Sequence, residues 1–193
     1  AGCTVVVKPS EFTSGSALEL ARLGTEAGVP EGVLSVVTGY GNPVGEAIVT
    51  SPDVDFVSFT GSTAVGRRIV ANSATTLKRV SVELGGKSAN IVLEDADLED
   101  AIDGSMFSVF FNQGECCCAG TRLLVQESVA DRFIERLLER VKTLKVGDVY
   151  AVDSDVGAMI SEAHFGRVCG YLEKGKAEGA RVLTGGGTDH AGG

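Results

Sequence analysis

Residues 54–84 read VDFVSFTGSTAVGRRIVANSATTLKRVSVEL, and this stretch indicates the fold. The apolar run at residues 54–60 predicts a strand, residues 62–73 predict a helix, and residues 78–84 predict a second strand. A strand, a helix and a strand in this order are typical of a crossover unit, in which the two strands pair in parallel.

The alternation of strand and helix begins further upstream. The sequence predicts a strand at 3–7, a helix at 10–28, a strand at 33–37 and a short helix at 44–49. The near-continuous apolar run Val5-Val6-Val7 is typical of a strand that is covered on both faces. We therefore expect an α/β fold, in which an open, doubly wound, mostly parallel but incomplete sheet occupies residues 1–84.

Residues 85–193 predict part of a second α/β domain. Further elements are expected as strands at 90–93, 123–126 and 181–183, and as an amphipathic helix at 162–178. Asp97 and Ser128 each precede apolar residues at helical spacing, so we expect these two side chains to cap two more helices. The run Gly185-Gly186-Gly187 predicts a loop.

Composition restricts the classes of function. With 44% hydrophobic residues, the 193-residue chain can bury a core, and its net charge of −9 argues against nonspecific nucleic-acid binding. No apolar stretch reaches the roughly 18 residues of a membrane span, and we expect no signal peptide. The five cysteines are odd in number and three are contiguous, which favours a reducing compartment, the cytoplasm. The chain does not begin with Met, and we expect both ends to be cut.

The cysteines lie in residues 110–122, which read FFNQGECCCAGTR. A thiol used for packing does not need glycine on both sides, whereas a reactive thiol needs a tight turn and close approach of a substrate. Zinc sites place thiolates two to four residues apart in pairs, so we expect no metal site. A buried cysteine cluster without chemistry is the alternative.

Glycine and charged residues follow several predicted strands. Gly61 and Ser62 stand where a strand meets a helix, whose free N–H groups attract phosphate; a capped helix without a ligand is the alternative. Lys8 and Glu11 follow the first strand, where an acid would bind ribose hydroxyls and favour NAD over NADP; a solvated loop is the alternative. For the glycine-rich residues 39–45 we prefer an ordinary turn.

Glu83 is an acid at the end of an otherwise apolar strand. We expect it to be desolvated there, which suits a general base near neutral pH, and an acid paired with a basic group is the alternative. The two histidines, His164 and His190, are expected at the surface, and no Ser/His/Asp arrangement is visible.

Together these segments resemble the aldehyde dehydrogenase superfamily, in particular the class that oxidises aldehydes to acids with NAD. The resemblance extends over nearly the whole chain, in the right order, at residues 5–11, 59–66, 83–87 and 110–120. The last two segments are similar to the family's glutamate and cysteine signatures, which are highly specific. The resemblance implies a Rossmann-like cofactor domain at 1–84 and a catalytic domain at 85–193, each present in part.

The resemblance also implies roles for single residues. Cys117 would be the nucleophile and Glu83 the general base that hydrolyses a thioester, while Cys116 and Cys118 would have no chemical role. NAD would be bound by Lys8, Glu11, Gly61, Ser62, Gly66 and Leu84. Glu115 departs from the family, which most often has glutamine there; its charge would disfavour a nearby thiolate, and we expect it to point away.

Family members are much longer than 193 residues, so the resemblance implies an internal fragment. It also implies that the parent enzyme acts on a small-molecule aldehyde and forms a homo-oligomer, and that the isolated fragment is inactive. Two alternatives remain: a non-catalytic NAD-binding or structural member of the fold, and the branch that transfers the acyl group to coenzyme A. Intact Cys117 argues against the first, and Glu83 argues against both.

Overall fold

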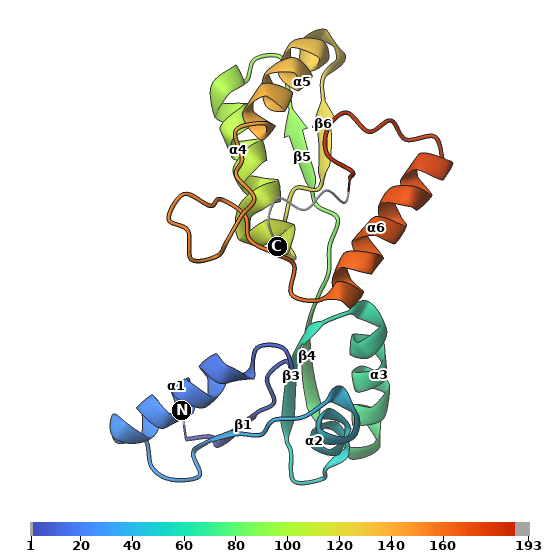
Figure 1. Cartoon of the computed structure of the whole chain (residues 1–193). Coiled ribbons are helices and arrows are strands. Elements are labelled where there is room, and N and C mark those ends of the chain that lie inside the picture. Colours follow the sequence, from blue (N-terminus) through green and yellow to red (C-terminus); the bar gives the residue numbers. More distant parts are fainter. Residues whose placement is uncertain (1, 188–193) are drawn as a thin grey trace. The chain divides into compact units, whose positions relative to one another are not determined.

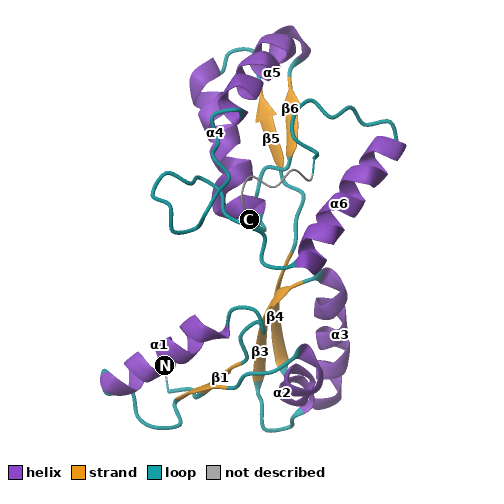
Figure 2. Cartoon of the chain, in the orientation of Figure 1, coloured by secondary structure: helices purple, strands orange, loops and turns teal. Residues whose placement is uncertain are grey.

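A computed structural model describes residues 2–187 of the chain, which divide into two compact units at Gly85 and Gly86 (Figures 1 and 2). Unit 1 contains β1 (Val5–Val7), α1 (Ser14–Glu26), β2 (Leu34–Val36), α2 (Glu46–Thr50), β3 (Phe56–Gly61), α3 (Thr63–Ser73) and β4 (Arg79–Leu84). Unit 2 contains β5 (Ala89–Val92), α4 (Leu98–Phe110), β6 (Arg122–Val125), α5 (Glu127–Val141) and α6 (Glu162–Ala177). A short 3-10 helix covers Ala74–Thr76, and tight turns cover Gly41–Gly45 and Phe111–Gly114.

The predicted α/β class and the predicted parallel pairing are confirmed. All three strand pairs, β1 with β2, β3 with β4 and β5 with β6, are parallel. Within residues 2–187 hydrogen bonds join the strands only in these pairs, so the incomplete open sheet that we expected at residues 1–84 consists of two two-stranded pieces, β1–β2 and β3–β4. Each piece is the product of one crossover, because the helix between two strands brings them side by side.

The core of unit 1 lies between the β3–β4 pair and the helices α2 and α3. Val49 from α2, Val57 from β3 and Ile69 from α3 are buried, and Val54, Phe59 and Val80 pack against them. Burial alternates along β4, so that its even-numbered residues turn toward this core and its odd-numbered residues toward solvent.

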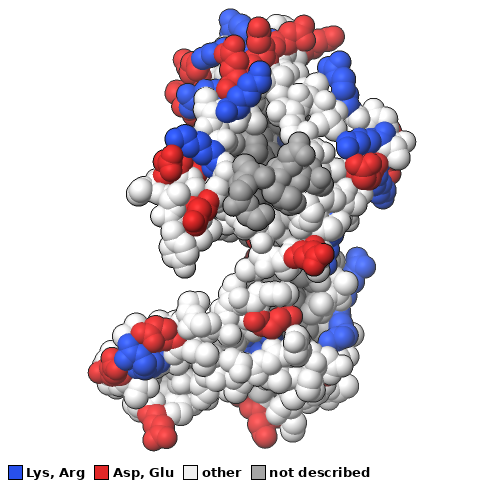
Figure 3. Space-filling model, in the orientation of Figure 1, with Lys and Arg blue, Asp and Glu red and all other residues white. Residues whose placement is uncertain are grey.

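The core of unit 2 lies between the β5–β6 pair and the helices α4 and α5. Val92, Ile102 and Phe133 are buried, the last two completely. Arg136 of α5 forms an ion pair with Glu99 of α4 at 3.0 Å, and further acidic and basic side chains are interspersed over these helices (Figure 3). Packing of apolar side chains therefore holds α5 against α4, with exposed ion pairs as a small addition.

The structure confirms one predicted helix cap and contradicts the other. The Asp97 carboxylate accepts hydrogen bonds from the backbone N–H groups of Glu99 and Asp100 at 3.0 and 3.1 Å, as expected for an N-cap. Helix α5 begins before Ser128, and its N-cap is Gln126. The backbone N–H of Gln126 donates to the carbonyl oxygen of Val92 in β5 at 2.9 Å. The strand therefore passes directly into the helix, and the Ser128 hydroxyl donates to the Glu94 carboxylate instead.

The strand predicted at residues 181–183 is wrong, because this segment is a loop. A strand needs a neighbour with which to exchange hydrogen bonds, and no strand in the described part of the chain pairs with it. The predicted loop at Gly185-Gly186-Gly187 is confirmed, and the φ angles of +66° and +72° at Gly185 and Gly186 explain the glycines. No helix within residues 2–187 is long and apolar enough to cross a membrane.

The buried core of unit 2 leads to a prediction about stability. Phe133→Ala should lower the free energy of unfolding by about 3–5 kcal/mol, because it removes a completely buried ring and leaves a cavity. Urea unfolding followed by far-UV circular dichroism measures this change. Tyr171→Ala, at a ring that is 70% exposed in the same unit, is the control and should change stability by less than about 0.5 kcal/mol. Equal losses in the two variants would contradict this core.

Candidate functional site

The carboxyl ends of β3 and β4 meet at one edge of unit 1. Their parallel register pairs Thr60 with Glu83 and Gly61 with Leu84, and Ser62 follows directly. The structure therefore brings four of the predicted site residues together: Gly61, Ser62, Glu83 and Leu84. The Glu83 side chain is exposed, so the expectation that it is desolvated is wrong for the described structure: the alternation along β4 turns it away from the core.

Helix α3 begins at this edge. Ser62 is its N-cap, and the Ser62 hydroxyl accepts a hydrogen bond from the N–H of Val65 at 3.3 Å. The first turn contains no acidic side chain, so the partial positive charge of the helix start is not neutralised there. Gly66 is buried, and a Cβ at this position would lie 2.7 Å from Leu84 Cδ2. Glycine at 66 thus lets α3 pack closely on the end of β4.

Lys8 lies at the carboxyl end of β1 and is held by the backbone. Its Nζ donates to the carbonyl oxygens of Pro9 and Gly39, at 2.7 and 2.9 Å, and lies 3.9 Å from Glu11 Oε2. The aliphatic part of the Lys8 side chain also lies beside Gly45: a Cβ built at position 45 would be 3.6 Å from Lys8 Cδ. The glycine-rich loop at 39–45 therefore holds the lysine in place, a role that the sequence did not predict.

The cysteine stretch has an unusual backbone. Asn112, Gln113 and Gly114 have consecutive positive φ angles of 51°, 61° and 79°, and the Asn112 side-chain amide donates to the carbonyl oxygen of Glu115 at 3.2 Å. Three successive left-handed residues turn the chain sharply after α4. The prediction of a tight turn beside the cysteines is confirmed, but asparagine and glutamine contribute to it as well as glycine.

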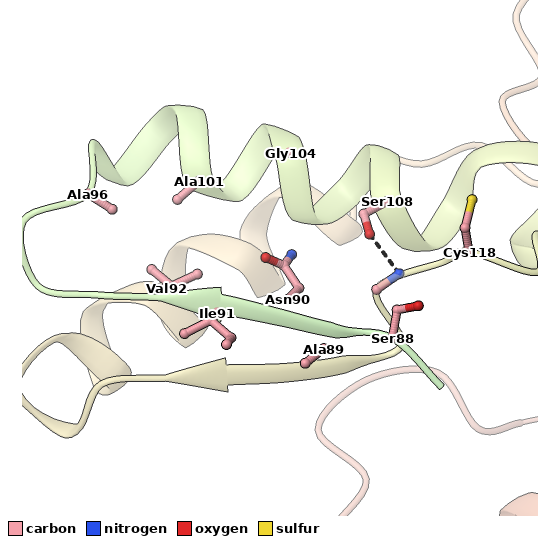
Figure 4. A pocket seen from close by; sticks show the side chains of 11 residues that line it. Ser88, Ala89, Asn90, Ile91, Val92, Ala96, Ala101, Gly104, Ser108 and Cys118 are labelled. Carbon is pink, nitrogen blue, oxygen red and sulfur yellow. Dashed lines mark hydrogen bonds between the residues drawn. The ribbon is translucent and has the colours of Figure 1, made fainter. Parts of the chain in front are cut away.

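The C-terminal end of the cysteine stretch is hydrogen-bonded to helix α4. The N–H of Gly120 donates to the hydroxyl of Ser108 in α4 at 2.8 Å, and a Cβ at Gly120 would lie 2.5 Å from the same oxygen (Figure 4). Ser108 and Cys118 border a cavity of about 370 Å³ between α4 and β5, lined mainly by small side chains. The Cys118 side chain thus faces this cavity (Figure 4).

Within unit 2, the last two residues of the glutamate signature, Gly86 and Lys87, meet the end of the cysteine stretch where β5 and β6 begin. The parallel register pairs Ala89 with Arg122, whose Nε donates to Lys87 O at 2.8 Å and whose backbone N–H donates to Ser88 O at 3.1 Å. A Cβ at Gly86 would lie 3.0 Å from the carbonyl oxygen of Cys117, closer than an ordinary contact. Gly86 is thus a site residue that the sequence analysis missed, although its place beside Gly85 in the signature was a signal.

The three adjacent thiols are not equivalent. Cys116 Sγ and Cys118 Sγ lie 3.4 Å apart. Cys117, which stands between them in the sequence, is exposed. Hydrogen bonds to the Cys116 sulfur from the backbone N–H and the thiol of Cys118 lower the pKa of Cys116. The hydrogen bond between the two thiols, followed by the charge of Cys116, raises the pKa of Cys118. Cys116 is thus the thiol of this pair with the lowered pKa, although the resemblance gives it no chemical role.

Glu115 points toward helix α6. Its Oε1 lies 3.2 Å from His164 Nε2, and both side chains are about one-third exposed. His164 is therefore a half-buried partner of the cysteine stretch rather than the surface residue that we expected. Nothing in the sequence around His164 indicated this contact. His190 lies outside the described residues.

Comparisons with known proteins agree with these motifs. The family model described as "Aldehyde dehydrogenase family" matches residues 1–193. The human mitochondrial aldehyde dehydrogenase is 48% identical over 187 residues, which are 96% of this chain and 36% of that protein. Among solved structures, the NAD-dependent aldehyde dehydrogenase from Sinorhizobium meliloti is 50% identical with a TM-score of 0.95, over 96% of this chain and 37% of that one.

A third relative is a solved structure with a bound cofactor. Betaine aldehyde dehydrogenase from Staphylococcus aureus in complex with NAD+ is 38% identical with a TM-score of 0.95, over 98% of this chain and 38% of that one. The chain spans somewhat more than a third of the length of these relatives. From its motifs, its fold and this match over its full length, the chain belongs to the aldehyde dehydrogenase family.

Proposed function

We propose that this chain is the central part of an NAD-dependent enzyme that oxidises an aldehyde to a carboxylic acid, with residues 1–84 in its cofactor domain and 85–193 in its catalytic domain. The observation that carries the proposal is the close approach of Gly86 to the carbonyl oxygen of Cys117. It joins the glutamate signature to the cysteine signature, and both motifs are needed for this chemistry. In isolation the chain is expected to be inactive.

The residues at the strand ends of unit 1 fit NAD. Ser62 opens a helix whose first turn lacks acidic side chains, which suits a diphosphate, and Gly66 and Leu84 let that helix lie close to β4. Lys8 and Glu11 would bind the adenosine ribose, and the Glu11 carboxylate would repel the extra phosphate of NADP. The chemistry that NAD supplies when bound is that of a hydride acceptor.

Cys117 would act as the nucleophile. Its thiolate attacks the aldehyde carbon, a C–S bond forms, and the carbonyl electron pair moves to oxygen, giving a thiohemiacetal. The backbone N–H of Cys117 is a candidate donor to that oxygen. Loss of a hydride from the same carbon leaves a thioester on Cys117. Exposure of the Cys117 side chain supports this role, since a substrate must reach the sulfur.

Glu83 would act as the general base. Its carboxylate takes a proton from water, the hydroxide attacks the thioester carbon, and cleavage of the C–S bond releases the acid and restores the Cys117 thiolate. Glu83 precedes Gly86 by three residues, and three extended residues span at most about 11 Å. The covalent chain thus limits the distance between the Glu83 backbone and the glycine that contacts Cys117.

Two further proposals concern the parent enzyme as a whole. We expect it to be a homo-oligomer, as the family resemblance implies, which native mass spectrometry would test. We place it in the cytoplasm, because five cysteines with three contiguous do not form a disulfide framework, and the mitochondrion is the alternative. Imaging of the tagged parent protein distinguishes the two compartments.

The nucleophile assignment is tested by serine substitutions in the parent enzyme. Cys117→Ser should lower aldehyde-dependent NADH formation by about 10³-fold or more, with NAD affinity kept, because a serine hydroxyl is a far weaker nucleophile than a thiolate. Cys116→Ser is the matched control and should keep turnover. Activity that is lost in Cys116→Ser and kept in Cys117→Ser would transfer the role to Cys116, whose pKa is lowered.

The base assignment has a different kinetic signature. Glu83→Gln should form about one equivalent of NADH in a rapid burst and then stall, because the thioester forms but water is not activated. The steady rate should fall by about 10²–10⁴-fold. Stopped-flow absorbance at 340 nm separates the two phases, and adding coenzyme A tests the acyl-transfer alternative. A normal steady rate in Glu83→Gln would remove Glu83 from this role.

The contact between the two signatures is tested by adding a methyl group. Gly86→Ala should lower kcat by about tenfold or more, because its Cβ would press on the Cys117 carbonyl and displace the thiol. Gly85→Ala is the matched control, since a Cβ there meets no atom within 4 Å, and it should change kcat little. Equal kcat values in the two variants would show that this contact does not position Cys117.

A further inference from the structure

Glu115 connects the cysteine stretch to helix α6. Its carboxylate lies 3.2 Å from His164 Nε2, and its backbone carbonyl accepts the Asn112 side-chain amide at 3.2 Å. Both ends of the residue are therefore held, two positions before Cys117. Fixing Glu115 at both ends restricts the backbone direction of the cysteines that follow it.

His164 is itself fixed at the start of α6. Ser161 is the N-cap of this helix, and its hydroxyl accepts a hydrogen bond from the backbone N–H of His164 at 3.2 Å. The loop before α6 makes a second contact with the turn, because a Cβ at Gly157 would lie 3.1 Å from Gln113 Nε2. The Glu115–His164 contact is thus accompanied by this second contact between the turn and the segment before α6.

The charge of Glu115 matters because of its distance along the chain from the thiol. An unpaired carboxylate close to a thiolate disfavours the thiolate, and a protonated imidazole on that carboxylate offsets the effect. Lys87 Nζ donates to the carbonyl oxygen of Gly86 at 2.9 Å, so a cationic side chain lies on the glycine that contacts Cys117. Glu115 is the acidic residue nearest to Cys117 along the chain.

We propose that Glu115 and His164 form a positioning pair, which orients the cysteine stretch and sets the reactivity of the Cys117 thiol. The pair rests on the proposed role of Cys117 and adds to it two residues that the mechanism does not use. It also accounts for the departure of this chain from the glutamine that the family resemblance implies at position 115. The glutamate is tolerated because α6 supplies a basic partner.

A double-mutant cycle in the parent enzyme tests this pair with His164→Gln, Glu115→Gln and the double variant. The readout is the rate of iodoacetamide alkylation of Cys117 between pH 6 and 8.5, with the modified cysteine identified by peptide fragmentation. His164→Gln should slow alkylation about three- to tenfold, because the Glu115 carboxylate loses its partner and no longer holds the cysteine stretch. Glu115→Gln should not slow alkylation, because it removes the carboxylate near the thiol.

The double variant decides between a positioning pair and two independent residues. His164→Gln should also lower turnover, and the double variant, with two neutral amides, should restore turnover and return the alkylation rate to within about twofold of the original. Glu173→Gln, which breaks the exposed ion pair with Lys176 on the same helix, is the control and should change neither readout. Unchanged alkylation in His164→Gln, or effects that simply add in the double variant, would overturn the pair.

Failure of the pair and failure of the proposed function are distinguishable. Alkylation reports on the thiol without any turnover, so the cycle can succeed or fail whatever the reaction is. Turnover that persists in Cys117→Ser would instead remove the proposed nucleophile, and with it the catalytic meaning of the pair.

Discussion

The parallel pairing of β5 with β6 is the constraint on which the candidate site depends. It matches Ala89 with Arg122, so the segments that enter the two strands must lie side by side. One of these segments is the end of the glutamate signature and the other is the end of the cysteine stretch. One backbone and one side-chain hydrogen bond from Arg122 reinforce the match, and glycine at 86 removes the Cβ that would keep the two segments apart.

In unit 1 as well, the register of two parallel strands brings site residues together at the strand ends. The register of β3 with β4 places the start of α3 beside Glu83, and Gly66 allows the helix to lie against Leu84 without a clash. Glycine serves close packing at both places, rather than a left-handed backbone. Left-handed residues are concentrated instead before the cysteines, where asparagine and glutamine join Gly114 in the turn. Backbone geometry thus does more than side-chain bonding to present the thiols.

Much of the fold was predictable, and the errors have identifiable physical causes. The parallel crossovers followed from apolar strands alternating with helices, and the Asp97 cap followed from local chemistry. Ser128 was misassigned because the strand β6 leads into the helix without a loop, which depends on a bond to Val92 rather than on local sequence. The strand expected at 181–183 failed because strand formation depends on a partner elsewhere in the chain.

By itself the sequence determined the class of fold, the family, and the residue types at the candidate site, because periodicity and short motifs are local properties. Only the tertiary structure decided that Gly86 lies against Cys117, that Cys116 and Cys118 share a hydrogen bond, and that Glu115 faces His164. Each of these contacts joins segments through register or through a turn of the backbone. Such distances are set by packing in three dimensions, and neither residue type nor spacing along the chain specifies them.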